Sequence, residues 1–317
     1  MKKHLCSAAL FLGLLAAFLF GLGLYFQPKN NTPEAGIQDY RASGFLSEAA
    51  GSLDYVVLGD SIPLTGVNPW VIWENQGFTG YVCATTGQTA EKSAAFLRAL
   101  FQTQAPKVVF LEANQLYKQY SPLDAAAARV TDAVPVLRYH DNWKFLRPSQ
   151  ALRPVNYGQD VPEKGYYLRK QIEAADPGDY MAPADTSDPI PTESRKSLER
   201  IAERCRAQGS RLVLISLPSP ANWNDGCHRA VEALAQELGV SYLDLNLEDL
   251  SINWSLDTLD GGDHLNETGA AKASAFLGDW LARNAELNDK RENPDYEDWR
   301  QDYAWFVSAA AAAEDTL

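Results

Sequence analysis

The sequence is poor in cysteine and histidine, with four of each in 317 residues. Cys6 lies in an apolar N-terminal run, and Cys83, Cys205 and Cys227 are an odd number without C-x-x-C spacing. This pattern is typical of neither a disulfide framework nor a zinc site. We expect scattered apolar thiols, although a bridge between Cys205 and Cys227 stays open for a chain that works outside the cell.

Positive charge is also scarce. Lys and Arg number 28 against 41 Asp and Glu, which gives a net charge of −13. Such a surface repels phosphate backbones, so we expect no nucleic-acid partner. Gly59 and Gly66 match neither nucleotide-binding fingerprint, and the histidines and carboxylates lack metal-ligand spacing. We therefore expect neither a cofactor nor a metal.

One long hydrophobic run is present, from Leu5 to Phe26. As a helix it would cover about 33 Å, which is enough to cross a bilayer. Lys2 and Lys3 precede it, so the positive-inside rule predicts a cytoplasmic N-terminus and a body on the other side. A cleaved signal peptide is the alternative, but the run is long for one and ends in bulky side chains. Either way we expect the body to work outside the cytoplasm.

After a polar stretch, short apolar runs alternate with helical patterns. Near-continuous apolar strands that alternate with helices predict a parallel sheet covered on both faces, a three-layer α/β/α fold of flavodoxin-like type. The expected strands are 55–58, 81–84, 107–111, 211–215 and 241–245, and the expected helices are 91–104, 194–208, 227–238 and 268–287.

The chain is expected to divide into four parts. Residues 1–28 would be a cytoplasmic stub and membrane anchor, 29–52 a linker, and 53–286 the α/β domain. Between about 121 and 191 the periodicity is poor, which predicts a long insertion packed over the sheet. In the tail, 287–317, aromatic residues at spacings of three and four predict a helix, either docked on the body or in contact with a partner or membrane.

Two stretches carry chemistry. The first strand runs into Gly59-Asp60-Ser61, which would expose a serine hydroxyl at the edge of the sheet where ligands bind. About 200 residues later, His264 lies before the last helix in DGGDHLN, with Asp260 and Asp263 beside it. A nucleophilic serine needs a base, and the base needs a carboxylate to hold its tautomer. We predict Ser61 as nucleophile and His264 as general base.

Two further residues follow strands. Gly87 lies after the second expected strand and Asn114 after the third, where both could donate hydrogen bonds to a developing oxyanion. With Ser61 and His264 they resemble the four blocks of the SGNH (GDSL-type) hydrolase superfamily, in the same order. The resemblance spans roughly residues 54–281. It implies an oxyanion hole formed by the Ser61 N–H, the Gly87 N–H and the Asn114 amide, with Asp60 shaping the turn.

The last block departs from the usual D-x-x-H of the superfamily. Gly261 stands three residues before His264, Asp260 four before and Asp263 immediately before. Adjacent side chains in extended backbone point apart, so we favour Asp260 as the partner of His264, and Asp263 remains the alternative.

The DHLNxxGA ending looks most like the envelope-associated branch of the superfamily. That likeness implies an esterase or O-acetyltransferase acting on cell-surface polysaccharide or another acylated glycan, beside a membrane-bound O-acyltransferase in some members. The alternative is a binding or assembly subunit with this fold, weak or inactive in catalysis, that partners such a transferase.

Two other histidines stand out. In RYHDNWKF, His140 and Asp141 would line the substrate cleft as a second His-Asp pair, with Trp143 and Tyr139 stacking on sugar rings. Alternatively, the segment is an aromatic cluster that anchors the insertion. His228 is expected to be a surface residue at a helix start.

Overall fold

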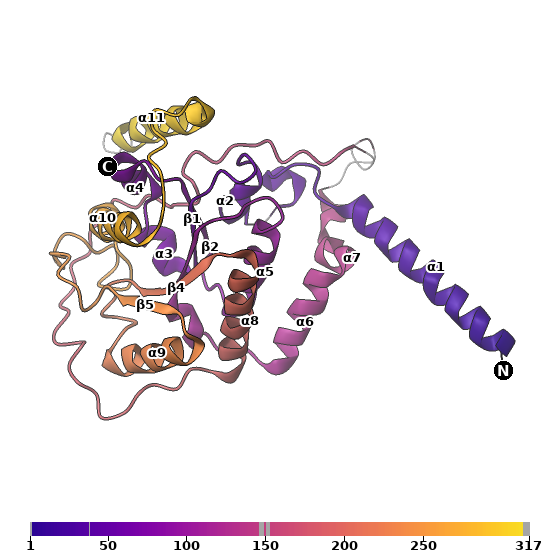
Figure 1. Ribbon diagram of the computed structural model, residues 1–317, viewed down its shortest axis with the longest axis horizontal. Helices are drawn as coiled ribbons and strands as arrows, with labels where there is room; N and C mark the ends of the chain where they lie inside the picture. Colours follow the sequence, from indigo (N-terminus) through magenta and orange to yellow (C-terminus); the bar gives the residue numbers. More distant parts are fainter. Residues whose placement is uncertain (1, 38, 146–148, 150–152, 313–317) are drawn as a thin grey trace.

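A five-stranded parallel sheet forms the centre of the protein (Figure 1). The computed structural model describes residues 2–37, 39–145, 149 and 153–312. The strands lie in the order β2-β1-β3-β4-β5, which is the flavodoxin-like order. Each neighbouring pair of these strands is parallel. The fold class predicted from the sequence is therefore confirmed.

The strands are short and buried on both faces. All five residues of each of the first three strands are buried, which explains their unbroken apolar sequences. The bounds are β1 Tyr55–Gly59, β2 Gly80–Ala84, β3 Val108–Glu112, β4 Arg211–Ser216 and β5 Ser241–Asp244. Each coincides with a predicted strand to within one residue at either end.

Helices cover both faces of the sheet and divide the core in two (Figure 1). One layer contains α5 (Ala90–Leu100), α8 (Thr192–Gln208) and α9 (Asp225–Leu238). The other contains α3 (Ser61–Gly66), α4 (Pro69–Gln76) and α10 (Glu267–Asn284). Alternate strand residues serve the two layers: Val56 and Leu58 pack into the first, Tyr55 and Val57 into the second.

The insertion predicted at about 121–191 is more regular than expected, and its first part does not pack over the sheet. It begins with a regular helix, α6 (Pro122–Ala133), which starts at a capping box between Ser121 and Asp124. The short helices α7 (Pro135–Arg138) and η4 (His140–Lys144) follow. These three lie against α5 and the N-terminal helix instead of the sheet. The later part does reach the sheet, where the Lys164 carbonyl accepts a hydrogen bond from Val82 of the edge strand β2.

The tail forms a docked helix, α11 (Glu297–Ala312), preceded by η5 (Pro294–Tyr296). Trp299 and Phe306 are buried, and Trp299 packs on Trp70 with ring centroids 5.3 Å apart. The buried Lys164 holds the junction by ion pairs to Glu48 and Asp302, at 2.7 and 2.6 Å. The docked-helix interpretation of the tail is the one the structure supports.

The N-terminal helix α1 (Lys2–Phe26) leaves the body instead of joining its core (Figure 1). Its stretch His4–Phe26 is long and apolar enough to cross a membrane, and the most apolar part of this stretch is not buried within the protein. The linker contains η1 (Pro33–Ala35), α2 (Tyr40–Ser43) and η2 (Gly44–Leu46).

All four cysteines are free thiols. Cys205 and Cys227 do not pair, and burial raises the pKa of Cys205 to about 12 and of Cys227 to about 11. Since the thiolate is the reactive form, both are inert apolar residues, as expected from the sequence.

Candidate active site

Ser61 is the first residue of α3, directly after the turn that ends β1. Asp60 caps this helix, because its Oδ1 accepts a hydrogen bond from the Ile62 N–H at 3.0 Å. The turn requires Gly59, since a Cβ there would lie 2.3 Å from Pro63. The cap takes the Ile62 N–H and leaves the N–H of Ser61 for another acceptor, as is usual at a helix start.

The sheet order explains why Ser61 lies in a ligand-binding position. In the order β2-β1-β3-β4-β5 the connections change direction at β1, so a crevice opens between the carboxyl ends of β1 and β3. Ser61 follows β1, and Asn114 follows β3. The fold thus brings two residues that are 53 positions apart to one crevice.

Asn114 is held beside the turn that carries Ser61. Its N–H is bonded to the Glu112 carboxylate at 3.0 Å, and its side-chain Nδ2 donates to Asp60 Oδ2 at 3.3 Å. Lys118 contacts the same Asp60 oxygen at 3.1 Å. Because a side-chain amide has two hydrogens, one remains for an oxyanion near Ser61.

Gly87 lies in the exposed turn that follows β2. The Gln88 N–H donates to the Thr85 carbonyl at 3.1 Å, and Gly87 has φ +67°. Nothing lies within 4 Å of the position that a Cβ would take, so backbone conformation and not space favours glycine here. No hydrogen bond within the described parts of the chain joins Gly87 to Ser61 or Asn114, and its role in an oxyanion hole stays a prediction.

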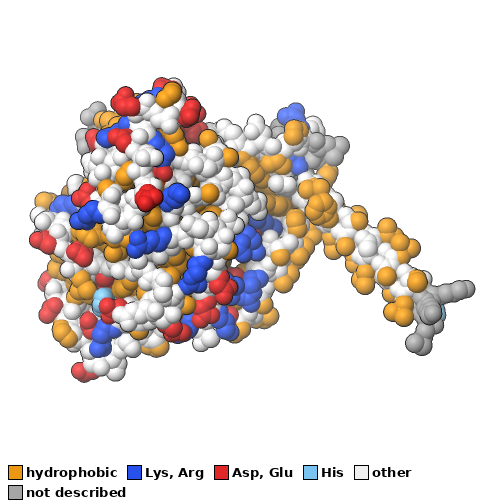
Figure 2. Space-filling model, in the orientation of Figure 1, with side chains coloured by type: hydrophobic (Ala, Val, Ile, Leu, Met, Phe, Trp, Pro, Cys, Tyr) orange, Lys and Arg blue, Asp and Glu red, His pale blue; other side chains and the backbone are white. Residues whose placement is uncertain are grey.

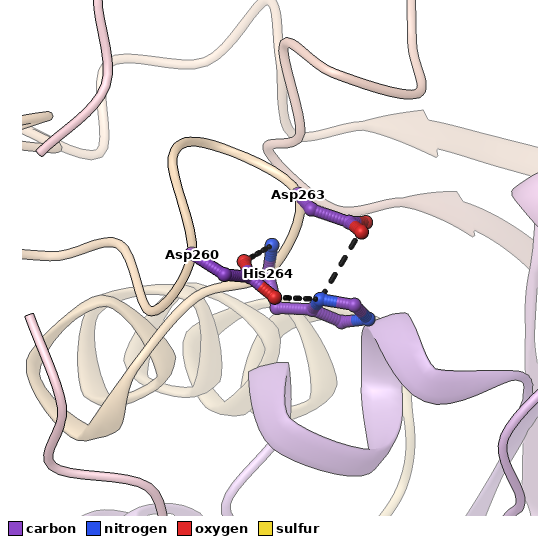
Figure 3. Close-up of side chains that lie close together, drawn as sticks. All are labelled: Asp260, Asp263 and His264. Carbon is purple, nitrogen blue, oxygen red and sulfur yellow. Dashed lines mark hydrogen bonds and ion pairs between the residues drawn. The ribbon is translucent and has the colours of Figure 1, made fainter. Parts of the chain in front are cut away.

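His264 lies in a tight loop that precedes α10. Asp260 binds it twice: Oδ1 accepts from the His264 N–H at 2.8 Å, and Oδ2 lies 2.8 Å from Nδ1 (Figure 3). Gly261 and Gly262, with φ +70° and +94°, form the bend between the two residues. These left-handed conformations are ones that glycine adopts without strain, so the extra residue of this block is accommodated in the bend.

Asp263 lies farther from the ring and is held by other groups. Its Oδ1 is 3.5 Å from His264 Nδ1 (Figure 3). Asn222 Nδ2 donates to this oxygen, and Ser219 Oγ donates to the Asp263 carbonyl at 2.7 Å. The geometry therefore favours Asp260 as the carboxylate that orients His264.

The residues next to Ser61 and His264 belong to one hydrophobic cluster. Ile62 and Leu265, the residues that follow Ser61 and His264, are both buried in the same side of the core. Helices α3 and α10 are in contact. At the start of α4, the helix after α3, the Asn68 N–H donates to Ser274 Oγ of α10 at 2.7 Å.

The second ring nitrogen of His264, Nε2, takes no part in the contact with Asp260. This nitrogen is buried and has no hydrogen-bond partner among the described residues. A hydrogen bond from Nδ1–H to Asp260 leaves an acceptor lone pair on Nε2, so this atom is ready to receive a proton. Seven other buried side-chain polar atoms in the described parts of the chain also lack a hydrogen-bond partner. Nε2 differs from them in its chemistry, because it belongs to an imidazole that a carboxylate holds. Hydrogen bonds to a nucleophile are often loose before substrate binds.

Residues 167–169 lie beside the two loops, which the sequence did not predict. The Tyr167 N–H donates to the Leu64 carbonyl of α3, and the Glu267 N–H of α10 donates to the Arg169 carbonyl, both at 2.8 Å. Residues 167–169 thus bridge the helix that begins with Ser61 and the helix that follows His264. The sequence predicted only that this stretch belongs to the insertion, and no spacing could have revealed the bridge.

Asp260, Asp263 and His264 lie close enough for a metal ion, with ligand atoms within 4.8 Å of one another. The Nδ1 atom that would face such an ion is hydrogen-bonded to Asp260. These contacts match the orienting role of a triad carboxylate and need no ion to explain them.

His228 is not a surface residue, so that prediction was wrong. Its side chain is 16% exposed, and Nδ1 lies 2.9 Å from Asp244 Oδ2. The same oxygen accepts from Trp223 Nε1 and from the Tyr242 hydroxyl, each at 2.9 Å. Asp244 also binds Asn246, whose Oδ1 accepts from the N–H of Ser219 at 3.1 Å. This second His-Asp pair therefore supports the residues that hold the His264 loop.

The segment with His140 and Trp143 lies near the N-terminal helix. The side chain of His140 is outside the described part of the structure. Trp143 is 64% exposed on η4, which contacts α1 and α7. The neighbouring Asn142 donates to the Phe26 carbonyl at 2.6 Å. These contacts join the segment to α1 and not to the loops of Ser61 and His264, so they give its predicted contact with substrate no support.

Glu112 is a buried carboxyl beneath the site. Burial raises its pKa well above 4.5, and the nearby charge of Asp60 raises it further. Its proton therefore stabilises the fold fully below pH 4.5, and this stability is lost as pH rises through the raised pKa. Glu112→Gln keeps the acceptor for Asn114 but has no proton to lose. We measure the unfolding free energy of both proteins by urea titration from pH 4 to 9. The free energy of Glu112→Gln should fall less steeply with pH than that of the wild type, and the two slopes should differ by up to about 1.4 kcal/mol per pH unit.

A second carboxyl serves as the control in that titration. Asp302 also has a raised pKa, of about 7, caused mainly by burial. It is present in both proteins, so only the difference between the two curves reports Glu112. Parallel curves would contradict the assignment.

No family model matches the sequence, and no curated protein matches it. The fold is similar to solved structures at low identity. A lipase/acylhydrolase from Enterococcus faecalis is 13% identical with a TM-score of 0.38, covering 72% of this chain and 95% of that one. A GDSL-like lipase from Bacteroides thetaiotaomicron is 14% identical with a TM-score of 0.34, covering 72% and 87%. The chemistry of this chain must accordingly be inferred from its own residues.

Proposed function

We propose that this chain is a member of the SGNH (GDSL-type) hydrolase superfamily and a serine acyl-transfer enzyme. Ser61 is the nucleophile, His264 its general base, and Asp260 the carboxylate that orients the base. The observation that supports this best is the buried Nε2 of His264, which Asp260 fixes and which has no partner among the described residues. The next residue, Leu265, lies in the same buried cluster as Ile62, the residue after Ser61.

The proposed reaction has two half-reactions. Ser61 Oγ attacks the ester carbonyl while His264 Nε2 takes its proton, and Asp260 stabilises the imidazolium that forms. The Ser61 N–H, the Gly87 N–H and the Asn114 amide stabilise the oxyanion. His264 then protonates the leaving alcohol, and an acyl-enzyme remains. Water or a sugar hydroxyl next attacks the acyl carbonyl and gives its proton to His264. His264 passes that proton to Ser61 Oγ as the bond between the acyl group and Oγ breaks.

The proposed location follows from α1. A span from His4 to Phe26 with Lys2 and Lys3 before it would leave the N-terminus in the cytoplasm and the body outside. Acylated glycans of the cell envelope are substrates that such a body would meet. The proposed activity is therefore that of a carbohydrate esterase, with water as acceptor, or of an O-acetyltransferase, with a sugar as acceptor.

A fluorophosphonate probe tests the proposal, because it reacts covalently with activated serines. The full chain in detergent should be labelled, and Ser61→Ala should lose the label. Ser308→Ala is the matched control, since Ser308 is an exposed residue of α11 whose hydroxyl donates to the Ala304 carbonyl. An unlabelled but folded wild type that releases no acetate from acetylated xylan would contradict the enzyme. That result would favour an assembly subunit for a membrane-bound O-acyltransferase.

A further inference from the structure

The segment α6–α7–η4 exposes large apolar side chains on the outside of the body. Leu123 is 77% exposed and Val130 is 53% exposed, seven residues apart and hence on one face of α6. Leu137, Trp143 and Phe145 continue this apolar surface through α7 and η4. The described side chains of residues 123–145 thus include five that are large, apolar and exposed. We call these five residues the apolar surface.

The body binds this segment from the other side and mainly through polar contacts. Among the described residues, Ala125 is the one that is buried in α6, and α7 has none. Arg129 of α6 pairs with Glu91 of α5 at 3.2 Å, and Arg98 of α5 pairs with Asp132. A cavity of about 380 Å³ lies between α5, the linker and η4. Leu137 and Phe145 line this cavity at the edge of the segment, whereas Leu123, Val130 and Trp143 do not. These three exposed side chains are therefore not needed to hold the segment on the body.

The apolar surface is continuous with α1. Gly23 of α1 packs on Pro135 so closely that an added Cβ would lie 2.6 Å from the proline Cβ. The Asn142 side chain binds the last carbonyl of α1, that of Phe26. Figure 1 shows α6 and α7 at the end of the body from which α1 departs. In Figure 2, hydrophobic side chains continue from α1 onto this edge of the body.

The charges around the surface match a membrane interface. Lys29 follows the end of α1. Lys144 lies next to Trp143 and pairs with Asp141 at 2.8 Å, and Asp132 is neutralised by Arg138 at 3.2 Å as well as by Arg98. Tryptophan and tyrosine are the residues that gather where a bilayer meets water. A helix with an apolar face and basic neighbours is typical of segments that lie in that layer.

We propose that the apolar surface lies in the headgroup layer of the bilayer crossed by α1, as a second contact with phospholipid. This inference rests on α1 being in the membrane and not on the acyl-transfer chemistry. Two contacts fix the body where one helix would leave it free to rotate. They also orient the candidate site, because α10, which follows His264, lies at the opposite end of the body from α1 (Figure 1).

Spin-label accessibility in the full chain tests the proposal. Leu123→Cys and Val130→Cys would each carry a nitroxide, in a Cys6→Ser background, since the three remaining cysteines are buried. The exposed Ile172→Cys and Leu256→Cys are matched controls outside the apolar surface. In nanodiscs of phosphatidylcholine and phosphatidylglycerol, we expect labels at 123 and 130 to show a severalfold higher ratio of oxygen to nickel-complex accessibility than the controls. Equal ratios at all four positions would overturn the proposal.

A charged variant extends the test. Leu123 and Val130 are exposed and make little contact with the body, so Leu123→Asp/Val130→Asp should fold normally by circular dichroism. A nitroxide at Leu137→Cys should then shift from lipid-like to water-like accessibility. If the label at 123 is exposed to water in nanodiscs but shielded from both reagents in native membranes, a protein partner covers the surface and the lipid proposal is wrong.

Discussion

Replacing His264 with alanine is expected to lower kcat/KM for ester hydrolysis by about 10⁴ to 10⁶, as loss of a triad base does. The reason is that Nε2 is the proposed proton acceptor for Ser61, and a serine hydroxyl without a base is a weak nucleophile. The measurement is hydrolysis of p-nitrophenyl acetate by the full chain in detergent. Ser61→Ala should fall to a similar level.

The double variant Ser61→Ala/His264→Ala distinguishes a catalytic pair from two separate defects. Residues that act as a unit are strongly non-additive, so the double variant should be no slower than either single variant. His228 is unsuitable as a silent control, because its bond to Asp244 supports the His264 loop. Ser308→Ala should retain full activity. Losses that multiply, or thermal unfolding of His264→Ala at a much lower temperature, would point to structural damage instead.

The sheet could be predicted from the sequence because its strands are buried on both faces. Such strands are apolar throughout and stand out between polar turns, as Tyr55 to Leu58 does. The parallel topology then follows from the alternation with helices. It also places the residues after β1 and β3 at one edge, which is why Ser61 and Asn114 could be predicted to lie at the same edge of the sheet.

The helix α6 could not be found in the same way. Its residues PLDAAAARVTDA bury only Ala125, so no apolar stripe faced a core and no periodicity indicated a helix. Its start was nevertheless encoded locally, by Pro122 and the capping box of Ser121 and Asp124. A helix that packs little on the body has a sequence governed by its caps and its exposed face.

The contacts that position the site were hidden for a different reason. Asp244 and His228 are 16 residues apart on a strand and a helix, and nothing in their spacing signals a bond. The network from Asp244 through Ser219 to Asp263 depends on tertiary packing that no motif records. The sequence thus predicted candidate residues for the chemistry, but not the residues that hold them.

Asp260→Asn is expected to lower kcat for ester hydrolysis by about 10³ to 10⁴ without unfolding the protein, since an amide cannot stabilise the required tautomer and imidazolium. Asp263→Asn should cost less than about tenfold, because its carboxylate is the more distant of the two. The two carboxylates are 2.8 and 3.5 Å from Nδ1, and only that of Asp260 also binds the His264 N–H.

Asn222 provides the decisive control between these two carboxylates, because it binds Asp263 and leaves Asp260 untouched. In Asn222→Ala, Asp263 is free to turn toward His264. If Asp263 can then substitute, Asp260→Asn/Asn222→Ala should recover part of the activity lost in Asp260→Asn, and Asp263→Asn added to that pair should abolish the recovery. If Asp260→Asn kept its rate and Asp263→Asn lost it, the assignment would be reversed. Asp263 would then orient the base, and the two hydrogen bonds between Asp260 and His264 would serve only to close the loop.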